Sequence, residues 1–362
     1  MTDLKDKIKA RIANDGPLTV AQFMSVCLSD PDAGYYTTRE PFGKDGDFIT
    51  APEVSQMFGE LVGAALLSAY EALGSPKQFE LVELGPGRGT LMSDLLRMAS
   101  LRPPFLQAAR LNLVEMSPRL RAIQKKTLTR FALKPEFRDG FRDVPDGPLI
   151  LVANEFFDAL PIHQFIRTTE GWKERQIGLD RSGELSFGAG TASLPEEAVP
   201  QEFAQSPEGT VFETQPASNA IAEEIGARLA ARGGVALIMD YGYLKTAPGD
   251  TLQALYKHAY DDVLSHPGDA DLTAHVNFEA LAAAARRSGA SPLPPLSQGE
   301  FLLRSGLLER AGVLGTGKTH QEQETIRDAV ERLAAPDQMG NLFKVLAITG
   351  NGEVFSPFDS AA

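Results

Sequence analysis

The sequence predicts an α/β fold in which a mostly parallel sheet carries a helical N-terminal cap and β-rich insertions. Short apolar strands alternate with helices from Phe79 onward, a pattern typical of parallel strands joined by right-handed crossovers. A glycine-rich turn directly follows the first of these strands. The chain has 362 residues, of which 43% are hydrophobic and 23% charged. That composition is ordinary for a globular chain with a sizeable core, so we expect a Rossmann-like fold with additions.

Residues 1–75 are predicted to form the helical cap and a segment that covers the ligand site. An amphipathic helix is expected to end at Gly16, and a second helix, starting after Thr19 as its cap, follows it. Residues 31–53 are rich in Gly, Pro and Asp, and their aromatic side chains favour burial, so they predict an ordered loop or hairpin. Helical periodicity then runs from Glu53 to Leu73.

Residues 76–362 are predicted to form the core domain. Its expected strands and helices are separated by short turns and follow one another in this order: strand 79–85, helix 91–100, strand 111–117, helix 118–128, strand 148–156, helix 219–233, strand 233–242, helix 278–288, strand-like 301–307, helix 322–333 and strand 343–350. Two insertions interrupt this order. Residues 164–213 predict β-hairpins with turns at Glu170-Gly171 and Ser182-Gly183. Residues 243–277 predict an irregular, polar stretch on the substrate side.

The turn ELGPGRGT places Gly85, Gly87 and Gly89 between a buried strand and a helix. Glycines there permit a tight turn and the close approach of a ligand, and the helix N-terminus offers free N–H groups. The loop matches neither the Walker A nor the GxGxxG pattern. Glu115 ends the next strand, where a carboxylate can accept both ribose hydroxyls of an adenosine. A structural turn beside an exposed glutamate is the alternative interpretation.

A second acidic cluster follows the predicted strand 148–156. Asn154, Glu155 and Asp158 lie just past its carboxyl end, where ligands of open α/β sheets bind. These carboxylates can hold a cation or position an amine, or they can simply cap the helix that follows. Asp240 and Tyr241 occupy the matching end of the next predicted strand, which can equally be a simple turn.

Composition excludes several classes of function. The net charge of −13 disfavours nucleic acid as a partner, because phosphate binding needs a basic face. The single cysteine, Cys27, cannot form an internal disulfide and fits a reducing compartment. The histidines of residues 243–277 show no compact metal-binding spacing, so no metal is expected. We find no apolar run long enough to span a membrane and no secretory signal, and expect a cytoplasmic protein.

Five blocks of sequence in order resemble the MidA family. The blocks are ELGPGRGTLMSDLLR, LVEMSPRLRAIQ, ANEFFDALPIHQF, ALIMDYGY and GDTLQALYKH…PGDADLTAHVNF, and FITAPEVSQMFGE before the first core strand also fits. The family comprises mitochondrial complex I assembly factors and their bacterial relatives. Its members are class I S-adenosylmethionine-dependent methyltransferases. The resemblance therefore implies a class I methyltransferase fold that binds S-adenosyl-L-methionine.

The resemblance also implies roles for individual residues. Those expected to bind the cofactor are Glu83, Gly85, Gly87, Gly89, Glu115, Thr50 and Ser55. Asn154 and Glu155 would lie beside the sulfonium, and we infer that Glu155 and Asp158 grip the substrate guanidinium. Candidate substrate-binding residues are Asp240, Tyr241, His258 and His275.

The implied activity is methylation of an arginine in a protein such as a complex I core subunit, in support of assembly. Two alternatives remain open at this point. One is an assembly factor that binds the cofactor without catalysis, and the other is a small-molecule methyltransferase.

Overall fold

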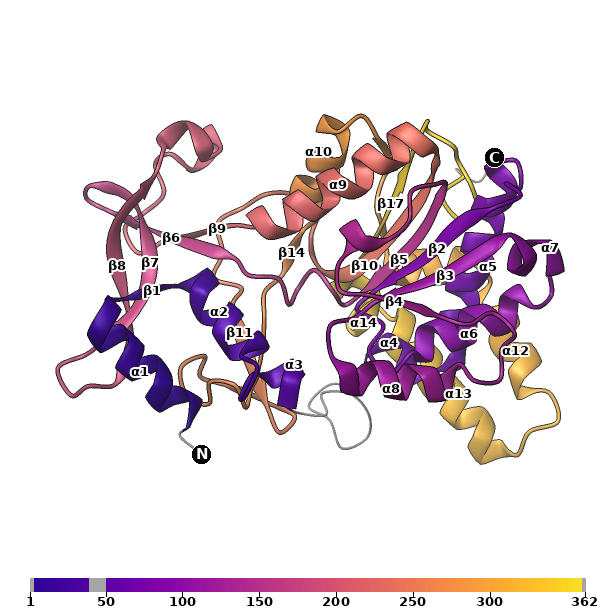
Figure 1. The fold of residues 1–362 in the computed structure, drawn as a ribbon, viewed down its shortest axis with the longest axis horizontal. Helices are drawn as coiled ribbons and strands as arrows, with labels where there is room; N and C mark the ends of the chain where they lie inside the picture. Colours follow the sequence, from indigo (N-terminus) through magenta and orange to yellow (C-terminus); the bar gives the residue numbers. More distant parts are fainter. Residues whose placement is uncertain (1–2, 39–49, 360–362) are drawn as a thin grey trace. The chain divides into compact units, whose positions relative to one another are not determined.

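The computed structural model describes residues 3–38 and 50–359, which group into two compact units. Unit 1 comprises the described residues of the ranges 1–48, 158–219 and 245–277, and unit 2 those of 49–157, 220–244 and 278–362. The chain therefore passes from one unit to the other several times. The colours of Figure 1 follow the sequence, so the segments of each unit can be located by their residue numbers.

A mostly parallel sheet forms the centre of unit 2, which confirms the predicted fold class. Its strands run in the order β15-β17-β10-β5-β2-β3-β4, and β16 also pairs with β17. The strands, in chain order, are β2 (Phe79–Leu84), β3 (Ala109–Val114), β4 (Glu136–Arg138), β5 (Leu149–Asn154), β10 (Gly234–Tyr243), β15 (Ser291–Pro292), β16 (Leu296–Ser297) and β17 (Phe343–Thr349). All neighbours from β10 to β4 are parallel, whereas β17 is antiparallel to β10.

Helices cover both faces of this sheet. They are α4 (Ala51–Val54), α5 (Gln56–Ala72), α6 (Thr90–Ala99), α7 (Pro103–Ala108), α8 (Pro118–Thr127), α9 (Pro216–Arg232), α10 (Phe278–Arg287), α11 (Gln298–Arg304), α12 (Leu307–Gly315), α13 (His320–Ala334) and α14 (Met339–Leu342). Figure 1 shows α9 and α10 on one face of the sheet and α6 and α8 on the other. A large apolar core lies between α5, α6 and the strands, whose side chains are mostly apolar because both faces of the sheet are covered.

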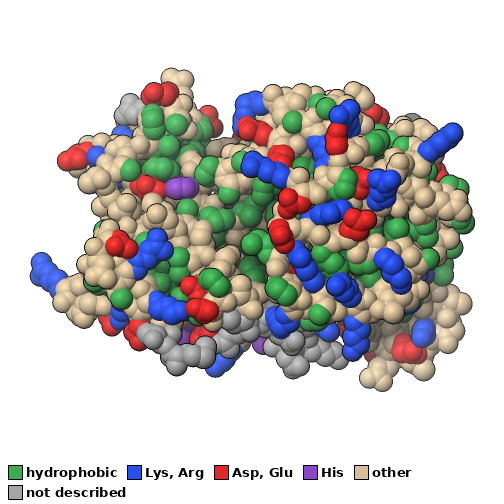
Figure 2. Space-filling view, in the orientation of Figure 1, with side chains coloured by type: hydrophobic (Ala, Val, Ile, Leu, Met, Phe, Trp, Pro, Cys, Tyr) green, Lys and Arg blue, Asp and Glu red, His purple; other side chains and the backbone are tan. Residues whose placement is uncertain are grey.

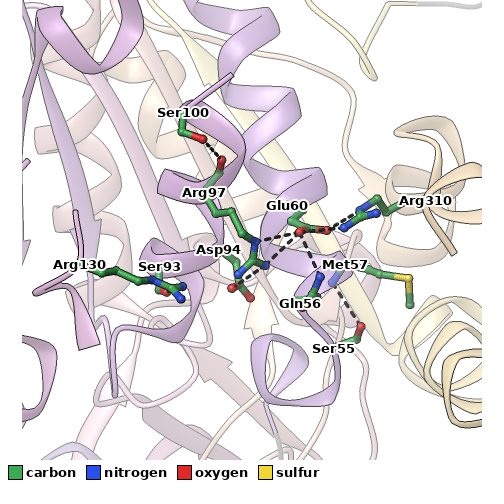
Figure 3. A network of polar contacts seen from close by, with 10 residues as sticks. All are labelled: Ser55, Gln56, Met57, Glu60, Ser93, Asp94, Arg97, Ser100, Arg130 and Arg310. Carbon is green, nitrogen blue, oxygen red and sulfur yellow. Dashed lines mark hydrogen bonds and ion pairs between the residues drawn. The ribbon is translucent and has the colours of Figure 1, made fainter. Parts of the chain in front are cut away.

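A buried ion-pair network joins α5, α6 and α12 (Figure 3). The Glu60 carboxylate of α5 accepts hydrogen bonds from Arg97 Nε of α6 at 3.0 Å and Arg310 Nε of α12 at 2.6 Å. Arg97 also pairs with Asp94 at 2.9 Å. Burial raises the pKa of Asp94 to about 6, against the opposing effect of Arg97. Glu60 is thus held by two guanidinium groups, which fixes α5 against α6 and α12.

Unit 1 consists of antiparallel strands and short helices. One sheet has the order β1-β7-β6-β9 with β8 pairing β7, and a second has the order β12-β11-β13. The elements are α1 (Leu4–Asp15), β1 (Leu18–Thr19), α2 (Val20–Ser29), α3 (Tyr35–Thr38), β6 (His163–Thr168), β7 (Gly171–Leu179), β8 (Leu185–Leu194), β9 (Val211–Thr214), β11 (Gln253–Tyr256), β12 (Ala259–Asp261), β13 (Asp271–Thr273) and β14 (Val276–Asn277). Apolar side chains of α1 and α2 pack with those of β7, β8 and β13 in one cluster, where Cys27 is also buried.

A saturated polar network is buried in unit 1. Gln164 has no exposed surface, and its Nε2 donates to Glu213 Oε1 and Asp250 Oδ1, both at 2.8 Å. Its Oε1 accepts from the Arg175 guanidinium at 3.0 Å. Glu213 in turn accepts from the backbone N–H and hydroxyl of Thr251 at 2.9 and 2.6 Å. Every polar atom of the Gln164 side chain therefore has a partner within the network.

The structure confirms most of the predicted elements. The helix ending at Gly16, the Thr19 cap and the two β-hairpin turns are all present. The expected helix over 53–73 is instead two helices, because the backbone at Ser55 is extended.

Three predictions about local structure need correction. Within the expected loop 31–53, residues 35–38 are helical, and Phe42 and Phe48 lie outside the described residues. The stretch 301–307 is not a strand, because α11 covers most of it and begins at a Ser297 cap that accepts from Glu300 N at 3.2 Å. The stretch 243–277 is not irregular, because β11, β12 and β13 form a small sheet there.

Candidate functional site

The candidate site lies where three neighbouring strands of unit 2 end together. Leu84 at the end of β2 is in register with Val114 of β3 on one side and Ala153 of β5 on the other. Glu115 and Glu155 directly follow β3 and β5, so both stand at the edge where the glycine loop begins. The strand order also reverses between β2 and β5. Open α/β sheets bind their ligands outside the carboxyl ends of strands at such a switch point.

The glycine loop has a backbone that other residues rarely adopt. Gly85, Gly87 and Gly89 have φ values of +61°, +51° and +79°. At Gly85 an added Cβ would also lie 2.9 Å from the ring of Phe156, so glycine is required there by packing as well as by conformation. Gly89 caps α6 in the left-handed conformation. The N-terminus of α6 therefore points out of a loop that leaves room for a ligand.

Glu115 is oriented by the chain's own donors. Its Oε1 accepts from Ser117 N at 2.7 Å, and its Oε2 accepts from Gln124 Nε2 at 3.2 Å. Burial is the main cause that raises the pKa of the Glu115 carboxyl. The same Gln124 Nε2 donates to the Gly87 carbonyl at 2.7 Å. Sequence reasoning missed Gln124, although it interrupts the apolar face that Leu120 and Leu128 form on its helix.

Glu155 adopts an unusual backbone conformation at the end of β5. Its φ is +50°, in the left-handed region that non-glycine residues seldom occupy. The Glu155 Oε1 atom accepts from Ala51 N at 3.1 Å and from Asn154 Nδ2 at 3.0 Å. Strained residues of this kind cluster at functional sites, and here the bonds from Ala51 and Asn154 hold the carboxylate at the switch point.

The short helix α4 connects two sides of the site. Ala51 N binds Glu155, and Glu53 Oε1 accepts from the hydroxyl of Thr90 at 2.7 Å. Thr90 is the first residue of α6, directly after the glycine loop. Thr50 stands at the N-cap position of α4, and Ser55 Oγ caps α5 by accepting from Met57 N at 3.2 Å. The segment predicted to cover the cofactor is thus tied both to the loop and to Glu155.

Three of the buried polar atoms that have no partner among the described residues belong to elements that meet at this edge. They are Glu83 Oε2 of β2, Gln124 Oε1 of α8 and Asn154 Oδ1 of β5. Burial raises the pKa of Glu83 to about 8. Buried polar groups normally have partners. These atoms, with the loop and Glu115, therefore fit a polar ligand such as an adenosyl group carrying an amino acid.

Asp240 and Tyr241 lie inside unit 2. Asp240 has no exposed surface, and its carboxylate accepts from Phe156 N at 3.2 Å, Phe157 N at 2.9 Å and Tyr241 N at 3.0 Å. These bonds hold the turn that follows β5 and explain the aspartate structurally. Tyr241 packs against Phe343 with ring centroids 5.5 Å apart. Their predicted role in substrate binding stays a prediction.

Asp158, His258 and His275 belong to unit 1. Asp158 is buried, whereas His258 is exposed at the turn between β11 and β12, where its φ is +64°. The backbone of His275 is held on both sides, since its N–H donates to Thr251 Oγ1 at 3.0 Å and its carbonyl accepts from Gln215 Nε2 at 2.6 Å. The roles predicted for these residues at the substrate stay predictions.

Two further features of the described residues bear on function. Within residues 3–38 and 50–359, no group of three or more His, Cys, Asp or Glu side chains is arranged to hold a metal ion. None of the helices in this part of the chain is long and apolar enough to cross a membrane. On the face of unit 2 seen in Figure 2, basic side chains are interspersed with acidic ones.

The doubly wound sheet with an antiparallel last strand, the glycine loop after β2 and the acid after β3 are the features of a class I methyltransferase. A family model described as S-adenosyl-L-methionine-dependent methyltransferase matches residues 61–296. Protein arginine methyltransferase NDUFAF7, mitochondrial, from Rattus norvegicus is 37% identical over 96% of this chain and 84% of its own length. The Drosophila melanogaster homolog is 38% identical over 95% of this chain and 84% of its own.

Solved structures agree with these sequence matches. A Burkholderia thailandensis crystal structure bound to S-adenosyl-homocysteine is 30% identical, with a TM-score of 0.85 over 99% of this chain and 93% of that chain. A native crystal structure from the same organism has a TM-score of 0.83 at 29% identity, covering 99% and 95%. The chain therefore belongs to the family of S-adenosyl-L-methionine-dependent methyltransferases that includes the NDUFAF7 proteins. Its cofactor is S-adenosyl-L-methionine.

Proposed function

We propose that this methyltransferase modifies an arginine side chain of a protein, with a complex I core subunit as the substrate. The observation that carries the proposal is the carboxylate of Glu155, held at the switch point in a left-handed conformation beside the glycine loop. The relatives named protein arginine methyltransferase, which match nearly the whole chain, support the choice of arginine. The resemblance to complex I assembly factors supports the choice of subunit.

The chemistry of the site fits this assignment. The cofactor supplies a methyl group on a positively charged sulfur. A guanidinium is protonated at neutral pH, so a carboxylate has to orient it and disperse its charge as the proton leaves. Glu155 is suited to this, because Asn154 and the backbone of α4 fix one of its oxygens in place. We further propose that Gly85, Gly87, Gly89, Glu83 and Glu115 hold the cofactor.

Glu155→Gln tests the catalytic role. The chain is incubated with methyl-labelled S-adenosylmethionine and complex I core subunits, and labelled residues are mapped by mass spectrometry. We expect label on arginine with the wild-type chain and a loss of at least 100-fold with Glu155→Gln. Affinity for S-adenosylhomocysteine should change by less than threefold, because the glycine loop and Glu115 are intact.

Three results would contradict the proposal. Label confined to small molecules would place the chain among small-molecule methyltransferases. No label in any protein, despite cofactor binding, would favour an assembly factor without catalysis. Label on a residue other than arginine would reject the substrate class. Cytoplasmic location stays a prediction, since the relatives above are named mitochondrial.

A further inference from the structure

We propose that Gln124 is a positioning residue that locks the glycine loop to the ribose-binding carboxylate and thereby sets the affinity for the cofactor. This inference rests on the proposed roles of Gly87 and Glu115. The side chain of Gln124 has no exposed surface. One amide nitrogen donates both to the Gly87 carbonyl at 2.7 Å and to Glu115 Oε2 at 3.2 Å. A single group therefore connects the two halves of the adenosyl site.

The helix α8 grips the loop at two consecutive carbonyls. Besides the bond from Gln124 to Gly87, the hydroxyl of Thr127 donates to the Arg88 carbonyl at 2.9 Å. The three glycines of the loop have positive φ values. Because glycine has no side chain to restrict or pack the backbone, the loop has little intrinsic preference for one conformation. Side chains from α8 supply the constraint that the loop lacks.

The bonds to Glu115 leave its carboxylate ready for two hydroxyl groups. Ser117 N occupies one position on Oε1, and Gln124 occupies one on Oε2. Each carboxylate oxygen can accept a second hydrogen bond, which matches the two hydroxyls of a ribose. Without Gln124 the carboxylate would keep, of these two bonds, only the one from Ser117 N, so it would be less ordered and a ligand would have to order it upon binding.

The chain offers a matched control in Gln298. This glutamine of α11 also has no exposed surface, and its Nε2 donates to a backbone carbonyl, that of Leu333, at 2.9 Å. Its Oε1, like that of Gln124, has no partner among the described residues. Replacing either glutamine by leucine removes the same kind of buried hydrogen bond. Only the change at position 124 removes a contact with the glycine loop and Glu115.

The experiment measures the dissociation constant of S-adenosylhomocysteine by calorimetry for the wild type, Gln124→Leu and Gln298→Leu. We expect Gln124→Leu to weaken binding about tenfold, as expected for the loss of a hydrogen bond to a charged group. Both variants should lower the melting temperature to a similar extent, because each loses a buried hydrogen bond. Gln298→Leu should change the affinity for S-adenosylhomocysteine by less than twofold. Equal weakening by both variants, or none by Gln124→Leu, would overturn the inference.

A second variant gives a readout that a purely structural role would not produce. Gln124→Glu places a carboxyl group against Glu115, so binding at pH 8 should be at least tenfold weaker than in the wild type. At pH 5.5 the pair can share a proton, and the ratio of variant to wild-type dissociation constants should narrow several-fold. A ratio that does not change with pH would overturn the inference. Absence of binding by the wild type would instead reject the proposed cofactor site.

Discussion

Two buried glutamines with opposite surroundings distinguish the polar interior of unit 1 from the sheet edge of unit 2. Gln164 in unit 1 uses all of its side-chain hydrogen-bonding groups within the network of Glu213, Asp250 and Arg175. Gln124 in unit 2 uses its nitrogen, while its oxygen has no partner among the described residues.

Full mutual satisfaction is what a structural network requires, because each unpaired buried group costs about 1–3 kcal/mol. Unpaired groups are tolerated where a ligand completes them. Gln298 Oε1 also lacks a partner among the described residues, so the unpaired oxygen alone does not mark a ligand site. The bonds of Gln124 to Gly87 and Glu115 are what place it at the proposed cofactor site.

The largest effect is expected at the glycine loop. Gly87→Val should weaken the binding of S-adenosylhomocysteine at least 100-fold, because a β-branched residue is disfavoured at a φ of +51° and its side chain would occupy the ligand's approach path. Calorimetry measures the change. Gly74→Val is the control, since Gly74 has a φ of +76° and no atom within 4 Å of an added Cβ. If both variants bind as the wild type does, the loop is not the cofactor site.

The next largest effect is expected at Gln164 in unit 1, where a substitution should change the stability of the fold but not the affinity for the cofactor. Gln164→Leu should lower the free energy of unfolding by about 2–3 kcal/mol, because it leaves the partners of Gln164 buried with fewer hydrogen bonds. Urea denaturation measures this loss. The affinity for S-adenosylhomocysteine should stay within twofold of the wild type. A large loss of affinity with unchanged stability would mean that this network also serves a ligand.

The buried carboxyl of Glu83 at the sheet edge should make the stability of the fold depend on pH. Burial raises its pKa to about 8 in the folded chain, whereas an unfolded glutamate titrates near ~4.3. The folded state therefore keeps a proton that the unfolded state loses, and stability falls as pH rises between these values. The slope is at most about 1.4 kcal/mol per pH unit.

Glu83→Gln should remove this contribution. Urea denaturation of both chains at pH 5.5 and 7.5 measures the difference in slope. The wild type should lose more stability over that interval than the variant. Parallel changes in the two chains would show that the Glu83 carboxyl is already ionised in the folded state.

The smallest effect concerns the backbone of Glu155. Glu155→Gly and Glu155→Ala both remove the carboxylate, but only alanine keeps a Cβ at a φ of +50°. The glycine variant should be about 1 kcal/mol more stable than the alanine variant, because left-handed backbone disfavours residues with a Cβ. Thermal denaturation compares the two. Equal stability would mean that the residue relaxes out of the left-handed region once the carboxylate is gone.

The sequence predicted the parts of the fold that depend on local pattern. Buried strands such as 79–84 and 149–154 are short and mostly apolar, and Thr19 is a standard cap. The helix α11 was mistaken for a strand because a short apolar run does not distinguish the two. The Ser297–Glu300 capping signal would have identified it.

For the candidate site, the pattern indicated Gly85, Gly87, Gly89 and Glu115, which the structure brings to one edge. It did not indicate Gln124, because a polar side chain next to charged residues predicts an exposed position, and the interrupted apolar face between Leu120 and Leu128 is a weak signal. Burial depends on which face of α8 meets the loop. The bonds of Glu155 to α4 join residues that are 104 positions apart, and local spacing cannot predict such a contact.

The position of β17 in the sheet also has a consequence for biosynthesis. This strand pairs with β10 along seven consecutive residues and lies between β10 and β15. It is synthesised after every other strand of the sheet. Until the ribosome has made it, one edge of β10 exposes unpaired backbone groups that other chains can bind. A nascent chain of this protein therefore presents an aggregation-prone edge from the synthesis of β10, which ends at Tyr243, until the synthesis of β17, which ends at Thr349.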